Sequence, residues 1–158
     1  TMLKKLPQHI ATLGFVGFMP IAPGTWGTGA AAVFVYLLAY MLDMTSIWGD
    51  FLLIAIFIPL FILGVYAAGK SEKLLGKTDS GHIVIDEVCG YLITMLFLPK
   101  TLPWLIAGFF VFRLFDVVKP APVRQVERAV HGGLGVMLDD VLAAVYSNIC
   151  LQLFRLIY

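Results

Sequence analysis

The strongest constraint in this 158-residue sequence is a run of eighteen residues, Phe51 to Ala68, without a single charged side chain. Such a run is close to the roughly 20 apolar residues that a helix needs to cross a bilayer. Hydrophobic residues make up 60% of the chain and charged residues 13%, whereas soluble domains have about 45–50% and about 25%. So few charges could not cover the large surface of a small soluble protein. We therefore expect an integral membrane protein.

Four other apolar runs have the length, or nearly the length, of a membrane helix. Together the five expected spans are residues 28–42, 51–68, 83–98, 102–118 and 136–158. The apolar segment Ile10 to Ala22 is broken by glycines and prolines, which predicts a short interfacial or re-entrant segment. The expected fold is an all-α membrane bundle of about five spans, forming a single membrane-embedded domain over residues 1–158.

The positions of lysine and arginine predict how the bundle is oriented, because cytoplasmic loops are enriched in both. With the N-terminus inside, eight of them lie on the cytoplasmic side and two, Lys100 and Arg155, lie outside. Arg113 falls within the fourth span. The net charge is only +1, so the chain has no basic field for nucleic acid. We expect a multi-pass protein of the cytoplasmic membrane.

Most of the charges within the predicted spans gather at one depth, near the cytoplasmic face. They are Arg113 and five acids: Asp86, Glu87, Asp116, Asp139 and Asp140. A charge at the centre of a membrane helix costs about 2.5–3.5 kcal/mol on insertion scales, and less near its end. Arg113 and Asp116 are three residues apart on one helix face and can neutralise each other. The other four acids need a further partner.

A divalent cation is the partner that best fits these four acids, since hard oxygen ligands favour Mg²⁺ or Mn²⁺. Neighbouring helix residues point about 100° apart, so both acids of a pair cannot face one ion equally. Because Gly90 lies four residues after Asp86 and Ala144 four after Asp140, close helix approach favours these two as direct ligands. Glu87 and Asp139 are then additional or supporting ligands. The alternative is that the acids cap helices or pair with nearby basic residues.

Basic residues and glycine-rich turns near the acids predict a binding site for a phosphate group. Arg113 and Lys119 lie closest to the acids along the chain and would neutralise a phosphate that bridges the metal. Glycine-rich turns that lead into a helix can offer backbone N–H groups to an anion. The further candidates for substrate binding are Thr25, Arg124, Arg128, His131, Gly132 and Gly133. Alternatively, the two arginines bind anionic lipid headgroups, and the other residues form simple turns or helix caps.

Four blocks of this sequence resemble the phosphatidylglycerophosphatase A family of bacterial membrane enzymes. They are PIAPGTWGT from Pro20, HIVIDEVCG from His82, FRLFDVVKPAPV from Phe112 and VHGGLGVMLDDVLAA from Val130. The resemblance implies a Mg²⁺-dependent hydrolase that converts phosphatidylglycerophosphate in the bilayer to phosphatidylglycerol and phosphate. It also implies a polar core composed of Asp86, Glu87, Arg113, Asp116, Lys119, Asp139 and Asp140. We expect Asp116 or Glu87 to orient the attacking water or accept its proton.

Two other kinds of protein are alternatives. Ser80-Gly81-His82 resembles a short motif of metal-independent lipid phosphatases with a histidine nucleophile, but the sequence contains no Arg-Pro dipeptide and lacks the other spacings of that class. A small ion or proton carrier would also place acids in a membrane. That alternative needs polar residues through the bilayer, and below the acids the third and fifth spans offer only Tyr91, Thr94, Tyr146, Ser147 and Asn148.

Overall fold

The structure is a computed structural model that describes residues 2–75 and 81–157, so Lys77, Asp79 and Ser80 lie outside the described residues. The described part is helical and contains no strand, which confirms the all-α prediction. Its elements are α1 (Met2–Ala11), η1 (Val16–Phe18), α2 (Pro23–Met41), α3 (Ile47–Leu75), α4 (Ile85–Thr94), α5 (Leu102–Val118), α6 (Val123–Ala129) and α7 (Gly133–Ile157).

Three helices of the described part, α2, α3 and α7, are long and apolar enough to cross a membrane. Helix α5 has the predicted bounds of the fourth span, with 17 residues. The expected third span differs, because its helix α4 has only 10 residues. At about 1.5 Å per residue, α4 covers about half of a hydrocarbon core of about 30 Å. The structure therefore supports fewer full crossings than the five that the apolar runs predicted.

Helix α4 ends early because side chains of α7 bind the carbonyl groups that it leaves open. Asn148 Nδ2 donates to the carbonyl oxygens of Thr94 at 2.9 Å and Leu96 at 2.7 Å. Gln152 and Arg155, further along the same helix face, donate to the carbonyls of Leu96 and Phe97. Irregular backbone at membrane depth is tolerated only where protein encloses and satisfies it, and α7 meets this requirement.

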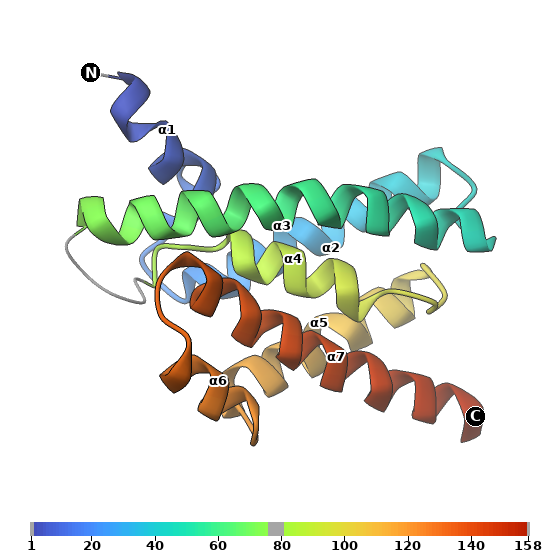
Figure 1. Ribbon diagram of the computed structural model, residues 1–158. Coiled ribbons are helices and arrows are strands. Elements are labelled where there is room, and N and C mark those ends of the chain that lie inside the picture. Colours follow the sequence, from blue (N-terminus) through green and yellow to red (C-terminus); the bar gives the residue numbers. More distant parts are fainter. Residues whose placement is uncertain (1, 76–80, 158) are drawn as a thin grey trace.

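Helix α4 occupies the middle of the bundle, in contact with α2, α3, α5 and α7 (Figure 1). The glycine at Gly90 allows two of these neighbours to come close. A Cβ atom there would lie 2.5 Å from Cζ of Phe112 on α5 and 3.2 Å from the backbone oxygen of Asp140 on α7. The predicted close approach at Gly90 is thus confirmed, and it brings the two acidic helices together.

The N-terminal segment is irregular between α1 and α2, as the glycines and prolines predicted. It contains only the short turn η1. Gly17 accepts a 2.7 Å hydrogen bond from Nδ1 of His82, which ties this segment to the start of α4. Ala22 has a left-handed φ of 47° and α2 begins at the next residue, Pro23. The location of this segment at the membrane interface stays a prediction.

Candidate metal and phosphate site

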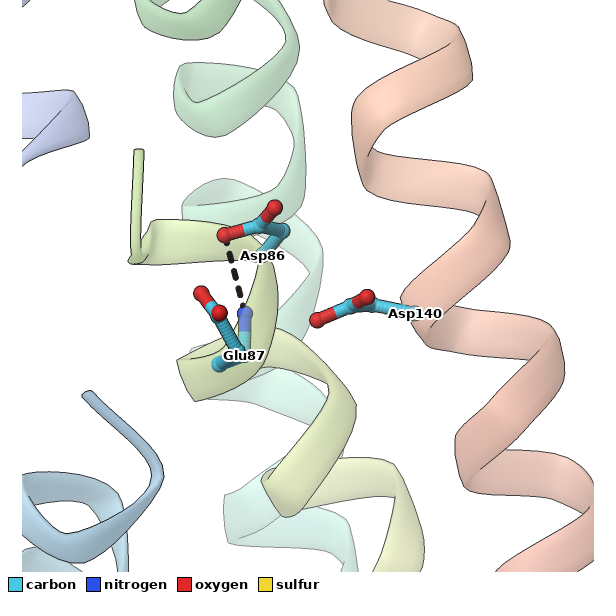
Figure 2. A group of neighbouring side chains, drawn as sticks. All are labelled: Asp86, Glu87 and Asp140. Carbon is cyan, nitrogen blue, oxygen red and sulfur yellow. Dashed lines mark hydrogen bonds between the residues drawn. The ribbon is translucent and has the colours of Figure 1, made fainter. Parts of the chain in front are cut away.

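Three buried or half-buried carboxylates from two helices converge at one end of the bundle. Asp86 and Glu87 lie in the first turn of α4, and Asp140 points toward them from α7 (Figure 2). Each offers one oxygen atom, and these three atoms lie within 4.8 Å of one another. This acidic cluster brings together three of the four acids predicted to bind a metal.

On each of the two helices, the first acid of an adjacent pair accepts the backbone N–H of the second. Oδ1 of Asp86 accepts the backbone N–H of Glu87 at 3.1 Å. The helix start also favours both acids of α4, because the amino end of a helix carries a partial positive charge. On α7, Oδ1 of Asp139 accepts the N–H of Asp140 at 3.0 Å.

Two oxygen atoms of the acidic cluster are buried without a hydrogen-bond partner among the described residues. They are Oε2 of Glu87 and Oδ2 of Asp140. A buried carboxylate oxygen without a partner is costly, and a cation bound between the two helices would satisfy both. The three carboxylates therefore fit a hard metal ion in chemistry and in spacing.

Arg113 lies beside the acidic cluster and pairs with an acid on each side. Its Nη1 is 2.5 Å from Oδ2 of Asp116 and 3.6 Å from Oε1 of Glu87. The predicted pair on one face of α5 is confirmed, and the contact to Glu87 adds a link to α4. All three side chains are largely buried. Arg113 thus places a fixed positive charge at the edge of the cluster.

Lys119 and Asp139 form a second ion pair, with Nζ and Oδ2 2.6 Å apart. Asp139 lies outside the acidic cluster, since its carboxylate turns toward the end of α5. The alternative that an acid pairs with a basic residue is therefore realised at this position. Lys119 ends α5 with a left-handed φ of 46°, a conformation that is uncommon for a residue with a side chain.

The start of α2 packs directly on the same site. A Cβ atom at Gly24 would lie 1.9 Å from Oε1 of Glu87 and 3.1 Å from Nη1 of Arg113. Only a glycine leaves room for these two side chains. The next residue, Thr25, is half-buried in the first turn of α2.

Arg124 and Arg128 line a surface cavity of about 350 Å³ that Lys119 also borders. Arg124 donates to the carbonyl of Val118 at 3.0 Å. The cavity places both arginines beside the Lys119–Asp139 pair. Gln125 lines it as well, and no motif in the sequence pointed to that residue.

The turn before α7 is explained by packing more than by anion binding. A Cβ atom at Gly133 would lie 2.0 Å from the carbonyl oxygen of Val65 on α3, so this glycine permits close helix contact. Gly132 has a left-handed φ of +74° and forms the turn. His131 is exposed, and no contact between it and the acidic cluster is found within the described residues.

The fold and the site define a helical protein of the membrane type with a compact group of acids and bases at one end. The model of the phosphatidylglycerophosphatase A family matches residues 9–155. The chain belongs to this family and is a phosphatase.

Three curated proteins resemble this chain along most of its length. Phosphatidylglycerophosphatase A of Escherichia coli (strain K12) is 40% identical over 89% of this chain and 79% of its own. A Bacteroides thetaiotaomicron protein, provisionally named a phosphatidylinositol-3-phosphatase, is 40% identical over 95% of this chain and 94% of its own. Phosphatidylglycerophosphatase A of Haemophilus influenzae is 37% identical over 93% of this chain and 90% of its own. No solved structure matches this chain.

Proposed function

We propose that this protein hydrolyses the terminal phosphomonoester of phosphatidylglycerophosphate, with Mg²⁺ as cofactor, to give phosphatidylglycerol and phosphate. The reaction would take place at the cytoplasmic face of the bacterial inner membrane, where the lipid substrate keeps its acyl chains in the bilayer. One observation carries the proposal: two carboxylate oxygens of the acidic cluster, from Glu87 and Asp140, are buried without a partner among the described residues, and the guanidinium of Arg113 lies 3.6 Å from the other oxygen of Glu87. This arrangement suits a cation and a phosphate that share one site.

The acidic cluster would hold the metal. Asp86 and Asp140 are the proposed direct ligands, with Glu87 next to them. Mg²⁺ when bound would polarise the phosphoryl group and lower the pKa of a coordinated water. Asp139 remains a supporting residue in this proposal, because its carboxylate is paired with Lys119.

Arg113 is the proposed binding partner of the phosphate. In phosphoryl transfer, charge on the equatorial oxygens is stabilised by fixed cations. The guanidinium of Arg113 is anchored by Asp116 and Glu87, so it is oriented before the substrate arrives. Lys119 would add a second positive charge, held in position by Asp139.

Glu87 is better suited than Asp116 to orient the attacking water or take its proton. Asp116 is held by Arg113 at 2.5 Å, so its carboxylate is already engaged in an ion pair. Glu87 lies 3.6 Å from Arg113 through one oxygen, and its other oxygen has no hydrogen-bond partner. In this proposal Asp116 positions Arg113, and Glu87 acts on the water.

The cavity with Arg124 and Arg128 would receive the phosphodiester that joins the headgroup glycerol to the diacylglycerol, at the interface. Thr25 would contribute its hydroxyl at the start of α2. His131 and Gly132 would border the entrance from the turn before α7, whereas Gly133 is buried against α3 and would act only by shaping that turn.

A second headgroup is supported by the resemblance to the Bacteroides thetaiotaomicron protein, which is provisionally named a phosphatidylinositol-3-phosphatase. Both lipids carry a phosphomonoester on a diacyl lipid, so the same acidic and basic groups would serve. To distinguish the two candidates, kcat/KM is measured for phosphatidylglycerophosphate and for phosphatidylinositol 3-phosphate, with phosphatidic acid as a third substrate for comparison.

The other two alternatives receive less support from the structure. His82 has its Nδ1 hydrogen-bonded to Gly17 and its ring stacked on Phe18, which are structural contacts. For a carrier, the polar side chains below the acids would have to face a water path. Instead Tyr91, Thr94, Tyr146, Ser147 and Asn148 each donate to a backbone carbonyl.

The deciding experiment measures phosphate release from phosphatidylglycerophosphate by the detergent-purified protein under three conditions: with Mg²⁺, with EDTA, and with excess Mg²⁺ added back after EDTA. We expect release only with the metal, and a loss of more than a thousandfold in Asp86→Asn and Asp140→Asn. The matched control is Asp43→Asn, because Asp43 is an exposed acid that contacts Thr45 in the α2–α3 turn. Near-normal turnover in both site variants, or full activity in EDTA, would remove the metal assignment.

A further inference from the structure

A second cavity, of about 300 Å³, lies between α2 and α5. Its lining consists of apolar and aromatic side chains, among them Ala32, Val33 and Tyr36 on α2 and Leu105, Ile106 and Phe109 on α5. Leu105 is buried, whereas Val33, Tyr36 and Ile106 are exposed along the rim. We call this cavity the α2–α5 groove. None of its lining residues belongs to the acidic cluster or to its basic neighbours.

Along α2, residues of the groove lie on the same helix face as Thr25 of the candidate phosphate site. Thr25, Gly29, Ala32 and Tyr36 follow one another at spacings of four, three and four residues. Residues at these spacings share one face of a helix. Thr25, at the start of α2, therefore stands at the head of the same stripe that lines the groove.

The same register occurs on α5. Arg113, Phe109, Ile106 and Leu102 are separated by four, three and four residues, so they also form one stripe. At about 1.5 Å per residue, the stripe extends about 17 Å from Arg113 to Leu102. That length is close to the depth of one leaflet in a hydrocarbon core of about 30 Å.

Small residues form this face of α2 between the site and the groove. Gly29 has no side chain, and the ring of Phe109 packs close to it, since a Cβ atom there would be in ordinary contact with the ring at 3.9 Å. Ala32, one turn further along α2, adds only a methyl group. On the α2 side, no bulky side chain of this face stands between the headgroup position and the groove, and Phe109 lines the end of the groove nearest the site.

We propose that the α2–α5 groove binds one acyl chain of the same lipid molecule whose phosphate occupies the acidic and basic site. This proposal rests on the proposed function. The headgroup and the chain of a lipid are covalently joined, and the two stripes lead from Thr25 and Arg113 to the groove. An ordinary bilayer lipid would fit the groove equally well in size, but its headgroup would not be fixed at the site.

The proposed role of the groove is to align the lipid headgroup with the acidic and basic site. The acyl chain leaves an environment of lipid tails that is as apolar as the groove, so burial adds little affinity. A chain held against α2 and α5 fixes the depth and the direction of the headgroup. Small displacements of a reacting group can lower the rate about a hundredfold, so a filled groove should affect turnover more than stability.

The first experiment fills the groove and compares two substrates with the same headgroup. We expect Ala32→Trp and Ile106→Trp to lower kcat/KM for dioleoyl phosphatidylglycerophosphate about tenfold or more. The dibutyryl analogue has chains that are too short to occupy the groove. Both variants should hydrolyse it with the same kcat/KM as the unaltered protein. The matched control is Ala30→Trp on the same helix, because Ala30 is exposed and does not line the groove.

The outcomes separate the two proposals. If the unaltered protein releases no phosphate from either substrate, the proposed function fails. If it hydrolyses both substrates and the groove variants match Ala30→Trp on the long-chain lipid, the groove proposal is overturned. An equal loss on the short-chain analogue also overturns it, because the substitution would then act on the site itself.

The second experiment locates the acyl chain without relying on turnover. A phosphatidylglycerophosphate with a diazirine in one acyl chain is photolysed in Mg²⁺ with the Glu87→Gln variant, which lacks the carboxylate proposed to act on the water and so should keep the substrate intact. The labelled peptides are identified by mass spectrometry. We expect labelling of residues 29–36 and 102–109, removed by excess unlabelled dibutyryl analogue and reduced in Ala32→Trp. Labelling spread over other lipid-facing helices, or insensitive to that competitor, would show an ordinary bilayer lipid and overturn the proposal.

Discussion

The ammonium group of Lys119 lies 2.6 Å from Oδ2 of Asp139, and this ion pair joins the end of α5 to the start of α7. The next acid along α7, Asp140, points toward Asp86 and Glu87 instead. Two adjacent carboxylates therefore have different partners. One stabilises a basic residue at the edge of the site, and the other belongs to the acidic cluster.

Replacing Asp139 with asparagine should lower kcat about tenfold and leave the Mg²⁺ concentration for half-maximal activity unchanged. The reason is that Lys119 loses its anchor while the acidic cluster keeps its three oxygens. Asp140→Asn, the isosteric change one residue later, should instead abolish activity. A Mg²⁺ titration of phosphate release checks both variants. A raised Mg²⁺ requirement in Asp139→Asn would place this residue among the ligands.

Gly24→Ala should reduce activity at least tenfold, because the new Cβ atom would lie 1.9 Å from Oε1 of Glu87. Either Glu87 or the start of α2 must move, and crowding of this kind typically costs about 1–3 kcal/mol of stability. Steady-state phosphate release and thermal unfolding in detergent measure the two effects. Gly81→Ala is the control, since a Cβ atom there would meet nothing within 4 Å. Equal activity of the two variants would contradict the packing of α2 on the site.

The sequence predicted those parts of the fold that follow from local pattern. Apolar runs identified α2, α3, α4, α5 and α7, though not α1 or α6, and α5 has the predicted bounds of residues 102–118. The pairing of Arg113 with Asp116 could be predicted because three residues bring two side chains to one helix face. The gathering of Asp86, Glu87 and Asp140 followed once the spans were oriented against one another.

Other features depend on contacts between helices and could not be predicted in the same way. The short length of α4 results from Asn148 and Gln152 on α7, whose amides bind carbonyls about fifty residues earlier in the chain. The role of Asp139 depends on the left-handed turn at Lys119, which nothing in the local sequence indicates. From the sequence, Gly133 is predicted to be part of a glycine-rich anion-binding turn. In the structure it packs against Val65 on α3.

Arg124→Gln combined with Arg128→Gln should raise KM for phosphatidylglycerophosphate in vesicles by up to about thirtyfold, with kcat unchanged. Both arginines line the cavity beside Lys119 and are exposed, and each basic residue near an anionic lipid surface contributes about 1 kcal/mol. The effect should shrink at high salt, because exposed charges are screened. Vesicle assays at two ionic strengths provide the test, with Lys73→Gln on the exposed end of α3 as control. A loss in kcat with unchanged KM would argue that the arginines act on the reacting phosphate.

Asn148→Leu should destabilise the bundle by about 1–3 kcal/mol, because it leaves the carbonyls of Thr94 and Leu96 without the amide that binds them. For a chain of this size such a loss lowers the midpoint of thermal unfolding by several degrees. At temperatures well below that midpoint the variant should keep its phosphatase activity and Mg²⁺ dependence, since Asn148 is two turns from Asp140 along α7. Ile149→Leu, a change at an exposed neighbouring position, is the control and should unfold at the same temperature as the unaltered protein. If Asn148→Leu and Ile149→Leu unfold at the same temperature, the end of α4 does not depend on α7, and the hydrogen bonds from α7 do not account for the short length of α4.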